Sequence, residues 1–289
     1  MPEPAQASPF SRILACIAVS PHAPEVVREA AWLAGLCGGE LAFVHAGDDE
    51  ELVRRTLSEA LGPGAGPPHL IARRGGPERV ILAEAEAWGA DLIFAGAVAN
   101  APLLRGVLGS VARRLARHAD RSVYLSLHRA GEPTLDSMAI AMNFDDDSRA
   151  AAQIGLGLAR RASARAVHIV HEYDPRARGA IDSVLAGSDQ ARYEQMVSGA
   201  QRFQLADAVQ ELDLGGISPR LACIEGQDLV QTTAYASDVG ADLLVLAAPH
   251  QRIGLLDRFF GDPTETVLQR FPCSVLLVRR PGGPRPPRG

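Results

Sequence analysis

The chain carries the same sequence pattern twice, and this repeat limits the folds that it can adopt. "GADLIFAG" begins at Gly89 and "GADLLVLAA" begins at Gly240, 151 residues later. "GSVARRLARHADRSVYLSL" begins at Gly109, and its counterpart "GDPTETVLQRFPCSVLLVR" begins at Gly261, 152 residues later. A chain of 289 residues is long enough for two domains with a core each. The repeat therefore predicts two copies of one structural unit.

Each copy alternates short apolar runs with longer stretches of helical spacing. Continuously apolar strands that alternate with helices are typical of a parallel sheet covered on both faces. We expect an α/β fold with two tandem domains, 1–130 and 131–289, each a five-stranded parallel sheet flanked by helices. The apolar runs are 13–19, 41–45, 69–72, 91–96 and 122–127 in the first copy and 138–144, 166–171, 219–224, 242–248 and 274–279 in the second.

Three segments fall outside this regular pattern. The polar Gly/Pro stretch 129–137 is the expected join between the domains. Segment 174–215 has no equally long counterpart in the first copy, and we expect a loop followed by a long amphipathic helix. The tail from about residue 281, "PGGPRPPRG", cannot build a core and is predicted to be disordered. The expected apolar face of the long helix consists of Tyr193, Met196, Val197, Ala200 and Phe203.

Composition excludes several classes of protein. The formal net charge of −5 gives no global basic field for nucleic acid. The sequence contains no lysine, which excludes Schiff-base chemistry and a P-loop. None of the four cysteines belongs to a C-x-x-C pair, as is typical of a reducing compartment. Without an apolar leader or an 18-residue apolar run, we expect a cytoplasmic protein with no membrane partner.

The turn at Gly109-Ser110 is the strongest candidate for a binding site. Ligands of open parallel sheets bind beyond the carboxyl ends of the strands, and the fourth strand of the first copy ends at Gly96. A helix that begins after a glycine-containing loop offers free N–H groups to a phosphate. Arg105, Arg113 and Arg114 lie near this turn in the sequence. The alternative, in which Ser110 only caps a helix, stays open.

The second copy changes this turn at the same place. Asp262-Pro263-Thr264-Glu265 is a strong helix start, with an acidic cap and proline at the first helical position. The carboxylates would repel a phosphate there, and Ala247 replaces the glycine at the end of the strand. The pattern therefore predicts an anion site in the first copy and a degenerate one in the second.

The repeated unit "ADLIFAG…GS…A…SVYL" resembles the universal stress protein family over nearly the whole chain. The family motif is G-x-x-G, nine residues, then G-S/T. Gly96, Ala99, Gly109 and Ser110 stand at these positions, so alanine replaces the second glycine. The resemblance implies Rossmann-like domains of the adenine nucleotide alpha hydrolase type. It also implies that ATP or AMP, with Mg²⁺, binds in the first copy near these residues and Val111 as a regulatory switch.

The resemblance also leaves an alternative open. Nucleotide-binding members carry an aspartate at the end of the first strand, where this chain has Ala18 and Asn143. A scaffold of the same family that binds no cofactor and acts through partner proteins is the competing hypothesis. In family dimers the last strands pair across a two-fold axis, so we expect 123–127 and 275–278 to pair within the chain. Further pairing of two chains into a homodimer also stays open.

Other constellations give weaker signals. His168 and His171 point to opposite faces of a strand, so they cannot share a metal ion. The run Asp145–Ser148 could hold Mg²⁺ beside a phosphate, but a solvated cap with the helix starting at Asp147 or Ser148 is favoured. The sequence has neither a G-x-S-x-G elbow nor the "S-G-G-x-D-S" loop of ATP pyrophosphatases. We therefore expect no enzyme, with slow ATP hydrolysis as the remaining alternative.

Overall fold

The computed structural model describes residues 8–64, 66–97, 108–127, 131–174, 190–248, 263–270 and 272–280. Several positions singled out in the sequence lie outside these ranges. They are Ala99, Arg105, Asp262 and the tail from residue 281.

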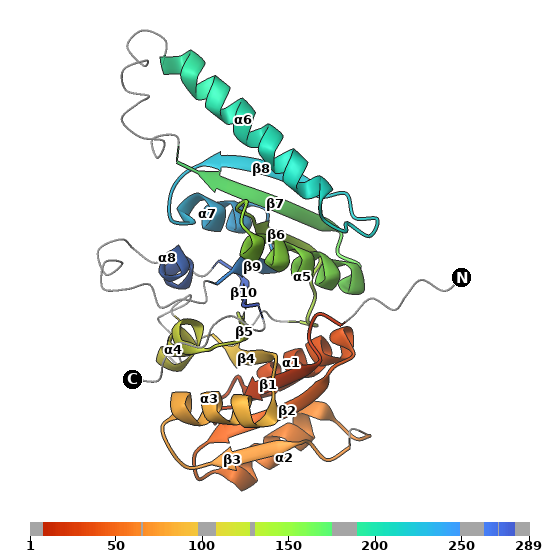
Figure 1. Cartoon of the computed structure of the whole chain (residues 1–289). Helices are drawn as coiled ribbons and strands as arrows, with labels where there is room; N and C mark the ends of the chain where they lie inside the picture. Colours follow the sequence, from red (N-terminus) through yellow and green to blue (C-terminus); the bar gives the residue numbers. More distant parts are fainter. Residues whose placement is uncertain are drawn as a thin grey trace.

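All ten predicted strands form, and they join into one continuous sheet (Figure 1). The order across the sheet is β3-β2-β1-β4-β5-β10-β9-β6-β7-β8. Every neighbouring pair is parallel except β5 and β10, which are antiparallel at the centre. The strands are β1 (Arg12–Cys16), β2 (Glu40–Ala46), β3 (Leu70–Arg73), β4 (Leu92–Gly96), β5 (Ser122–Ser126), β6 (Ser137–Ala141), β7 (Ala166–Tyr173), β8 (Arg220–Glu225), β9 (Leu243–Ala247) and β10 (Ser274–Val278).

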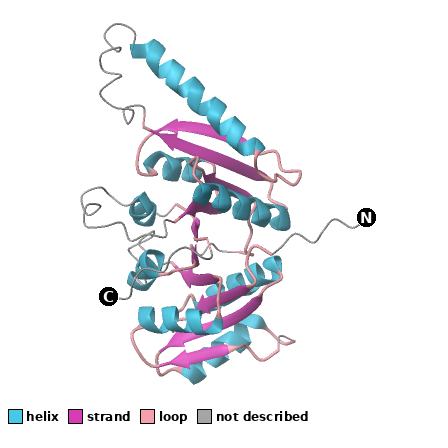
Figure 2. Cartoon of the chain, viewed as in Figure 1, coloured by secondary structure: helices cyan, strands magenta, loops and turns pink. Residues whose placement is uncertain are grey.

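Helices cover both faces of the sheet, as the continuously apolar strands predict (Figure 2). One buried cluster joins the sheet to α1, α2, α5 and α6, and the other joins it to α3, α4, α7 and α8. The fold is thus Rossmann-like in both halves. The helices are α1 (Ala23–Cys37), α2 (Glu50–Leu61), α3 (Pro77–Trp88), α4 (Ser110–His118), α5 (Asp146–Ala162), α6 (Gln190–Gln210), α7 (Val230–Asp238) and α8 (Pro263–Arg270).

The last strands of the two halves pair with each other, as predicted. Leu276 lies opposite Tyr124 in the antiparallel register, and Leu277 lies opposite Val123. The seam is closed at both ends by serines at the same position in each copy. Ser274 Oγ accepts from the N–H of Leu127 at 3.0 Å, and Ser122 Oγ accepts from the N–H of Arg279 at 3.1 Å. The sheet therefore runs from one half into the other without a break.

The long helix predicted in segment 174–215 is α6, but its buried face differs from the prediction. Met196 and Phe203 are 65% and 76% exposed. The buried positions are Gln201, Leu205, Ala208 and Val209, which pack over β7 and β8. The sequence pattern failed here because apolar residues lie all around this helix, so their spacing does not single out one face.

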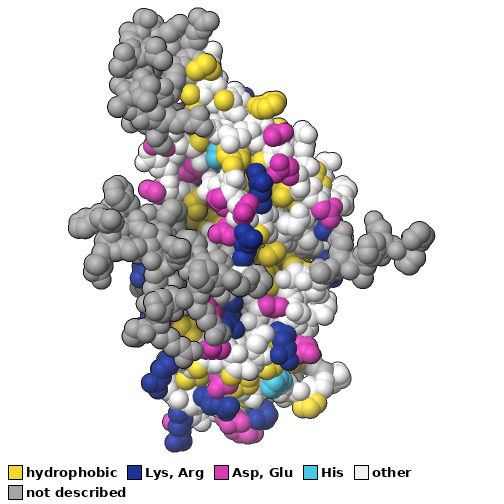
Figure 3. Space-filling model, viewed as in Figure 1, with side chains coloured by type: hydrophobic (Ala, Val, Ile, Leu, Met, Phe, Trp, Pro, Cys, Tyr) yellow, Lys and Arg dark blue, Asp and Glu magenta, His cyan; other side chains and the backbone are white. Residues whose placement is uncertain are grey.

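On the face drawn in Figure 3, acidic and basic side chains are interspersed.

Helix α5 starts at Asp146, one residue before the first predicted start and two before the second, because Asp145 is its N-cap. The carboxylate Oδ1 of Asp145 accepts from the N–H of Ser148 at 2.7 Å. This is the usual role of an aspartate immediately before a helix. The side chain of Asp145 therefore has a hydrogen-bond partner within its own turn.

Asp145→Ala is expected to lower the free energy of unfolding by about 1 kcal/mol, because the N–H of Ser148 loses its acceptor. Urea denaturation measures the loss. Asp146→Ala, which removes a charge from the same turn but leaves the cap, is the control and is expected to cost less. If Mg²⁺ stabilises the wild type but not Asp145→Ala, the acidic run holds a metal ion and the cap is not its main role.

Candidate functional site

A pocket of ≈ 580 Å³ opens in the first half, where the carboxyl ends of β1, β2 and β4 meet the starts of α1, α3 and α4. Its position is the switch point of the half, because the chain runs outward from β1 to β2 on one side and to β4 on the other. Its volume lies within the range of small-molecule sites. The lining residues are Cys16, Ile17, Ala18, Val19, Ser20, His22, Ala23, Val26, Val44, His45, Ala46, Gly47, Asp49, Pro77, Ile81, Ala95, Gly96, Gly109, Ser110, Val111 and Ala112.

Four of the five predicted site residues line this pocket. Gly96 ends β4, and Gly109, Ser110 and Val111 form the start of α4. The fifth, Ala99, lies outside the described residues. The predicted turn and the pocket therefore coincide along the part of the turn that the structure describes.

The N-terminus of α4 is built to leave its N–H groups available. Gly109 is the N-cap, in an extended conformation, and it has no side chain to accept from the first turn. Ser110 is the first helical residue and not the N-cap, so the alternative in which Ser110 caps the helix is wrong. Among the described residues, a Cβ on Gly109 would meet only the carbonyl oxygen of Ala97, at 3.9 Å. The described residues therefore leave room for a ligand at the helix start.

The two described arginines near the turn, Arg113 and Arg114, are not part of the lining. Arg114 Nε lies 3.1 Å from Glu78 Oε2 on α3, and the other oxygen of Glu78 bonds His118. Arg114 and His118 are four residues apart, so they share the face of α4 that packs on α3. Arg113 does not line the pocket, and Arg105 lies outside the described residues. Among the described residues, the positive end of the site is the helix itself.

The other end of the pocket is mainly apolar. Ala18 lines it at the position where the family resemblance led us to look for an aspartate. Cys16 also contributes, and burial raises the pKa of its thiol to about 12, so the thiol stays neutral. A buried polar group here is His45, whose side chain is 5% exposed. Sequence reasoning missed it, although "VHA" and "VHE" in the two copies repeat the histidine.

The second half fills the corresponding region with its own side chains. Glu172 follows His171 at the end of β7, as Ala46 follows His45 in β2. The carboxylate Oε2 of Glu172 accepts from the backbone N–H and the hydroxyl of Thr232, at 2.7 and 2.8 Å. A carboxylate thus occupies the start of α7, whereas Ala46 lines the pocket of the first half.

The two histidines of β7 point to opposite sides, as predicted. His168 Nδ1 lies 2.8 Å from the hydroxyl of Tyr235 on α7. His171 contacts the carbonyl of Met142 and the side chain of Gln201 on α6. Over the ranges that the structure describes, no group of three histidine, cysteine or acidic side chains is arranged to hold a metal ion.

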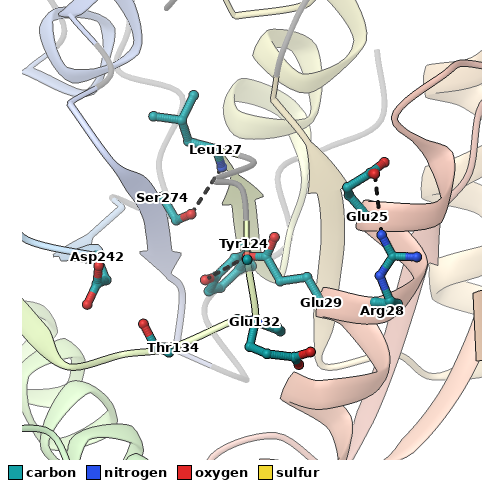
Figure 4. A pocket seen from close by; sticks show the side chains of 11 residues that line it. Glu25, Arg28, Glu29, Tyr124, Leu127, Glu132, Thr134, Asp242 and Ser274 are labelled. Atoms are coloured by element: carbon teal, nitrogen blue, oxygen red, sulfur yellow. Dashed lines mark hydrogen bonds and ion pairs between the residues drawn. The ribbon is translucent and has the colours of Figure 1, made fainter.

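A second cavity lies at the seam between the halves, but at ≈ 70 Å³ it is far smaller (Figure 4). The carboxylate of Glu29 on α1 accepts from the hydroxyls of Tyr124 and Ser126 on β5. Burial, together with the charge of Glu29, holds the pKa of Tyr124 well above its usual value. This hydrogen-bonded cluster joins α1 to the central strands and has the character of a structural contact.

The fold defines the chain as a tandem Rossmann-like α/β protein with a pocket at the switch point of its first half. The family model described as "Universal stress protein family" matches residues 47–126 and 135–279. These segments make up most of the sequence, and the chain belongs to the universal stress protein family.

Solved structures with the same fold span both halves. A functionally unknown protein from Pseudomonas aeruginosa PAO1 is 21% identical, with 93% of this chain and 92% of that one covered at a TM-score of 0.69. A universal stress protein from Archaeoglobus fulgidus DSM 4304 is 15% identical, with 95% and 99% covered at a TM-score of 0.64. No curated protein is significantly similar to the chain. Among the described helices, none combines the length and the apolar character that crossing a membrane requires.

Proposed function

We propose that the first half binds ATP, accompanied by Mg²⁺, or AMP, and that the occupied state acts as a regulatory signal in the stress response. The observation that carries this proposal is the start of α4. It is a nine-residue helix with a glycine N-cap, and it opens into a ligand-sized pocket at the switch point. Unpaired N–H groups and the positive end of the helix dipole favour a phosphate at this place.

The shape of the pocket supports a nucleotide better than a free phosphate. From the start of α4 the lining continues over β1 to β2, where Val44 and Ala46 lie beside the polar side chains of His45 and Asp49. A nucleoside phosphate needs this division, with an anion site at one end and a mainly apolar surface for the base at the other. Gly96, Gly109, Ser110 and Val111 are the proposed phosphate contacts.

The second half is proposed to bind no nucleotide. The copy of the α4 turn in the second half has Asp262 and Glu265 in its sequence, and their carboxylates would repel a phosphate there. Glu172 also bonds Thr232 at the start of α7, the counterpart of α3, so this part of the surface is satisfied internally. One nucleotide per chain is therefore the proposed stoichiometry.

A specific observation favours a second candidate function. Ala18 lines the pocket without offering the polar contact expected of nucleotide-binding members. A smaller cavity, of ≈ 290 Å³, shares Ala18 and Val19 with this pocket and extends toward Leu52 on α2. Val19 and Leu52 are 47% and 37% exposed. A scaffold that binds a partner or an apolar ligand here, and no nucleotide, would use the same surface.

One experiment separates the two functions. Protein purified without added nucleotide is denatured, and the released small molecules are identified by ion-pair chromatography. Thermal melts with ATP and Mg²⁺, or with AMP, follow on the same preparation. We expect a co-purified adenine nucleotide, or a melting temperature that rises with ligand concentration. If neither appears at millimolar ATP, the nucleotide hypothesis is wrong and the scaffold function stands.

A further inference from the structure

His45 and His171 occupy the same position in the two halves and make the same backbone contact. His45 Nδ1 lies 2.9 Å from the carbonyl oxygen of Ile17, just beyond β1. His171 Nδ1 lies 2.9 Å from the carbonyl oxygen of Met142, just beyond β6. A carbonyl can only accept, so the Nδ1 of each ring carries the hydrogen. In the neutral ring, Nε2 is then a hydrogen-bond acceptor.

The two rings differ in what their Nε2 atoms meet. His171 Nε2 lies 3.1 Å from the side-chain amide of Gln201 on α6, and the amide N–H₂ group donates to it once the amide is oriented by this contact. His45 Nε2 is buried, and the described residues supply no hydrogen-bond partner for it. Because a buried polar atom without a partner is costly, such an atom in the lining of a pocket points to a ligand that completes it.

Large aromatic side chains flank the ring of His171, whereas the residues at the same positions around His45 are smaller. The ring of Phe144 lies 4.3 Å from that of His171, centroid to centroid, and the ring of Tyr173 lies 6.2 Å away. In the first half these two positions are Val19 and Gly47. Both line the pocket, and a Cβ on Gly47 would come within 2.6 Å of His45 Nε2. The residues that close the second half are therefore small in the first.

His45 and the start of α4 lie at opposite ends of the pocket. His45 is on β2 and α4 follows β4, with β1 between these two strands (Figure 1). Two strand spacings put the two ends on the order of 10 Å apart. A nucleoside monophosphate spans about this length from its phosphate to the far side of its base, so both ends can contact one molecule.

We propose that His45 recognises the nucleoside part of the ligand, with Nε2 accepting a hydrogen bond from an N–H or O–H group. This inference rests on the proposed nucleotide-binding function and adds a specificity-determining residue to it. The donor is the amino group of the adenine base or a ribose hydroxyl, since both have the required chemistry. A ligand that offers a carbonyl oxygen at this point would be disfavoured, because two acceptors would face each other.

The test compares His45→Phe with His171→Phe, a matched control that loses the same backbone contact in the other half. Calorimetry measures the Kd of ATP, inosine triphosphate, 2′-deoxy-ATP and 3′-deoxy-ATP for the wild type and both variants. We expect His45→Phe to weaken ATP binding about 10-fold, as the loss of one hydrogen bond predicts. The preference for ATP over the analogue that lacks the donor should disappear in this variant and persist in His171→Phe.

The analogues identify the donor. Inosine triphosphate lacks the amino group of the base, and each deoxy analogue lacks one hydroxyl. If His45→Phe binds ATP as tightly as the wild type and keeps all three preferences, the role of His45 is refuted while nucleotide binding stands. If the wild type itself binds no nucleotide, the proposed function fails, and this inference fails with it.

A second measurement uses the wild-type protein, so it does not depend on whether a variant folds. In protein labelled with ¹⁵N-histidine, long-range ¹H–¹⁵N spectra report the tautomer of each ring. We expect the His45 ring to carry its hydrogen on Nδ1, and its Nε2 resonance to move when ATP is added while that of His171 stays in place. A His45 signal that ATP leaves unchanged contradicts the proposal.

Discussion

Gly109→Asp is expected to abolish nucleotide binding in the first half and, at the same time, to raise the stability of the unliganded protein slightly. Aspartate is a better N-cap than glycine, by a few tenths of a kcal/mol. The described residues leave room for the new side chain, because a Cβ at this position meets only one of their atoms, at 3.9 Å. Its carboxylate would accept from the N–H groups of Val111 and Ala112 that a phosphate needs. Binding and stability should therefore change in opposite directions.

Two measurements on the same preparations check this expectation. Calorimetry with ATP should show a loss of at least 100-fold, since a carboxylate both occupies the site and repels the phosphate, at about 3 kcal/mol in total. Urea denaturation without ligand should show an unchanged or higher midpoint. A lower midpoint in the variant would mean that lost binding reflects damage to the fold.

The control places the same charge on the neighbouring helix. Gly76 is the N-cap of α3, also extended, and a Cβ on it meets nothing within 4 Å. The following residue, Pro77, has no N–H to offer a ligand. We expect Gly76→Asp to retain ATP binding within a few-fold of the wild type. If Gly76→Asp abolishes binding and Gly109→Asp does not, the anion site is at α3 and the assignment to α4 is wrong.

Leu277→Ala is expected to destabilise the first half although Leu277 belongs to the second. Its side chain is fully buried on β10, opposite Val123 of β5, at the seam. Removing a buried leucine costs about 2–5 kcal/mol, including the cavity that it leaves. Because the sheet is continuous across this seam, the loss of stability should affect both halves.

The chain offers a probe for one side alone. Its two tryptophans, Trp32 on α1 and Trp88 on α3, both lie in the first half. Tryptophan fluorescence should report a lower urea midpoint in Leu277→Ala, coincident with the midpoint from far-UV circular dichroism. Leu221→Ala on β8, where the side chain is 43% exposed, is the control and should change stability by about 0.5 kcal/mol or less. A fluorescence midpoint that stays at the wild-type value would show that the halves unfold independently.

The sequence predicted the strands well because most of them are continuously apolar and all recur in the second copy. It also predicted the pairing across the seam, through the family resemblance. The face of α6 could not be predicted from spacing, because Met196 and Phe203 are apolar and yet exposed. Which residues of α6 are buried depends on which side of the helix meets β7 and β8. Tertiary packing determines that side.

The candidate site was predicted in part. The glycines of the β4–α4 turn were found because short backbone motifs are visible in sequence. His45 was missed because its role depends on an atom without a partner, and an unfilled space leaves no mark in a residue pattern. Glu172 was missed for a similar reason, since its contact with Thr232 joins residues 60 positions apart. Arg113 and Arg114 do not line the pocket as expected, because proximity in sequence does not fix the direction of a helical side chain. Arg105 lies outside the described residues.

The antiparallel pair of β5 and β10 has a consequence for how the protein behaves when it is scarce. Two separate domains that met through these strands would come apart on dilution, as any dimer does. Here both strands belong to one chain, so each meets its partner at a fixed effective concentration. The pairing is therefore independent of abundance, and the first molecule that a cell makes is already assembled.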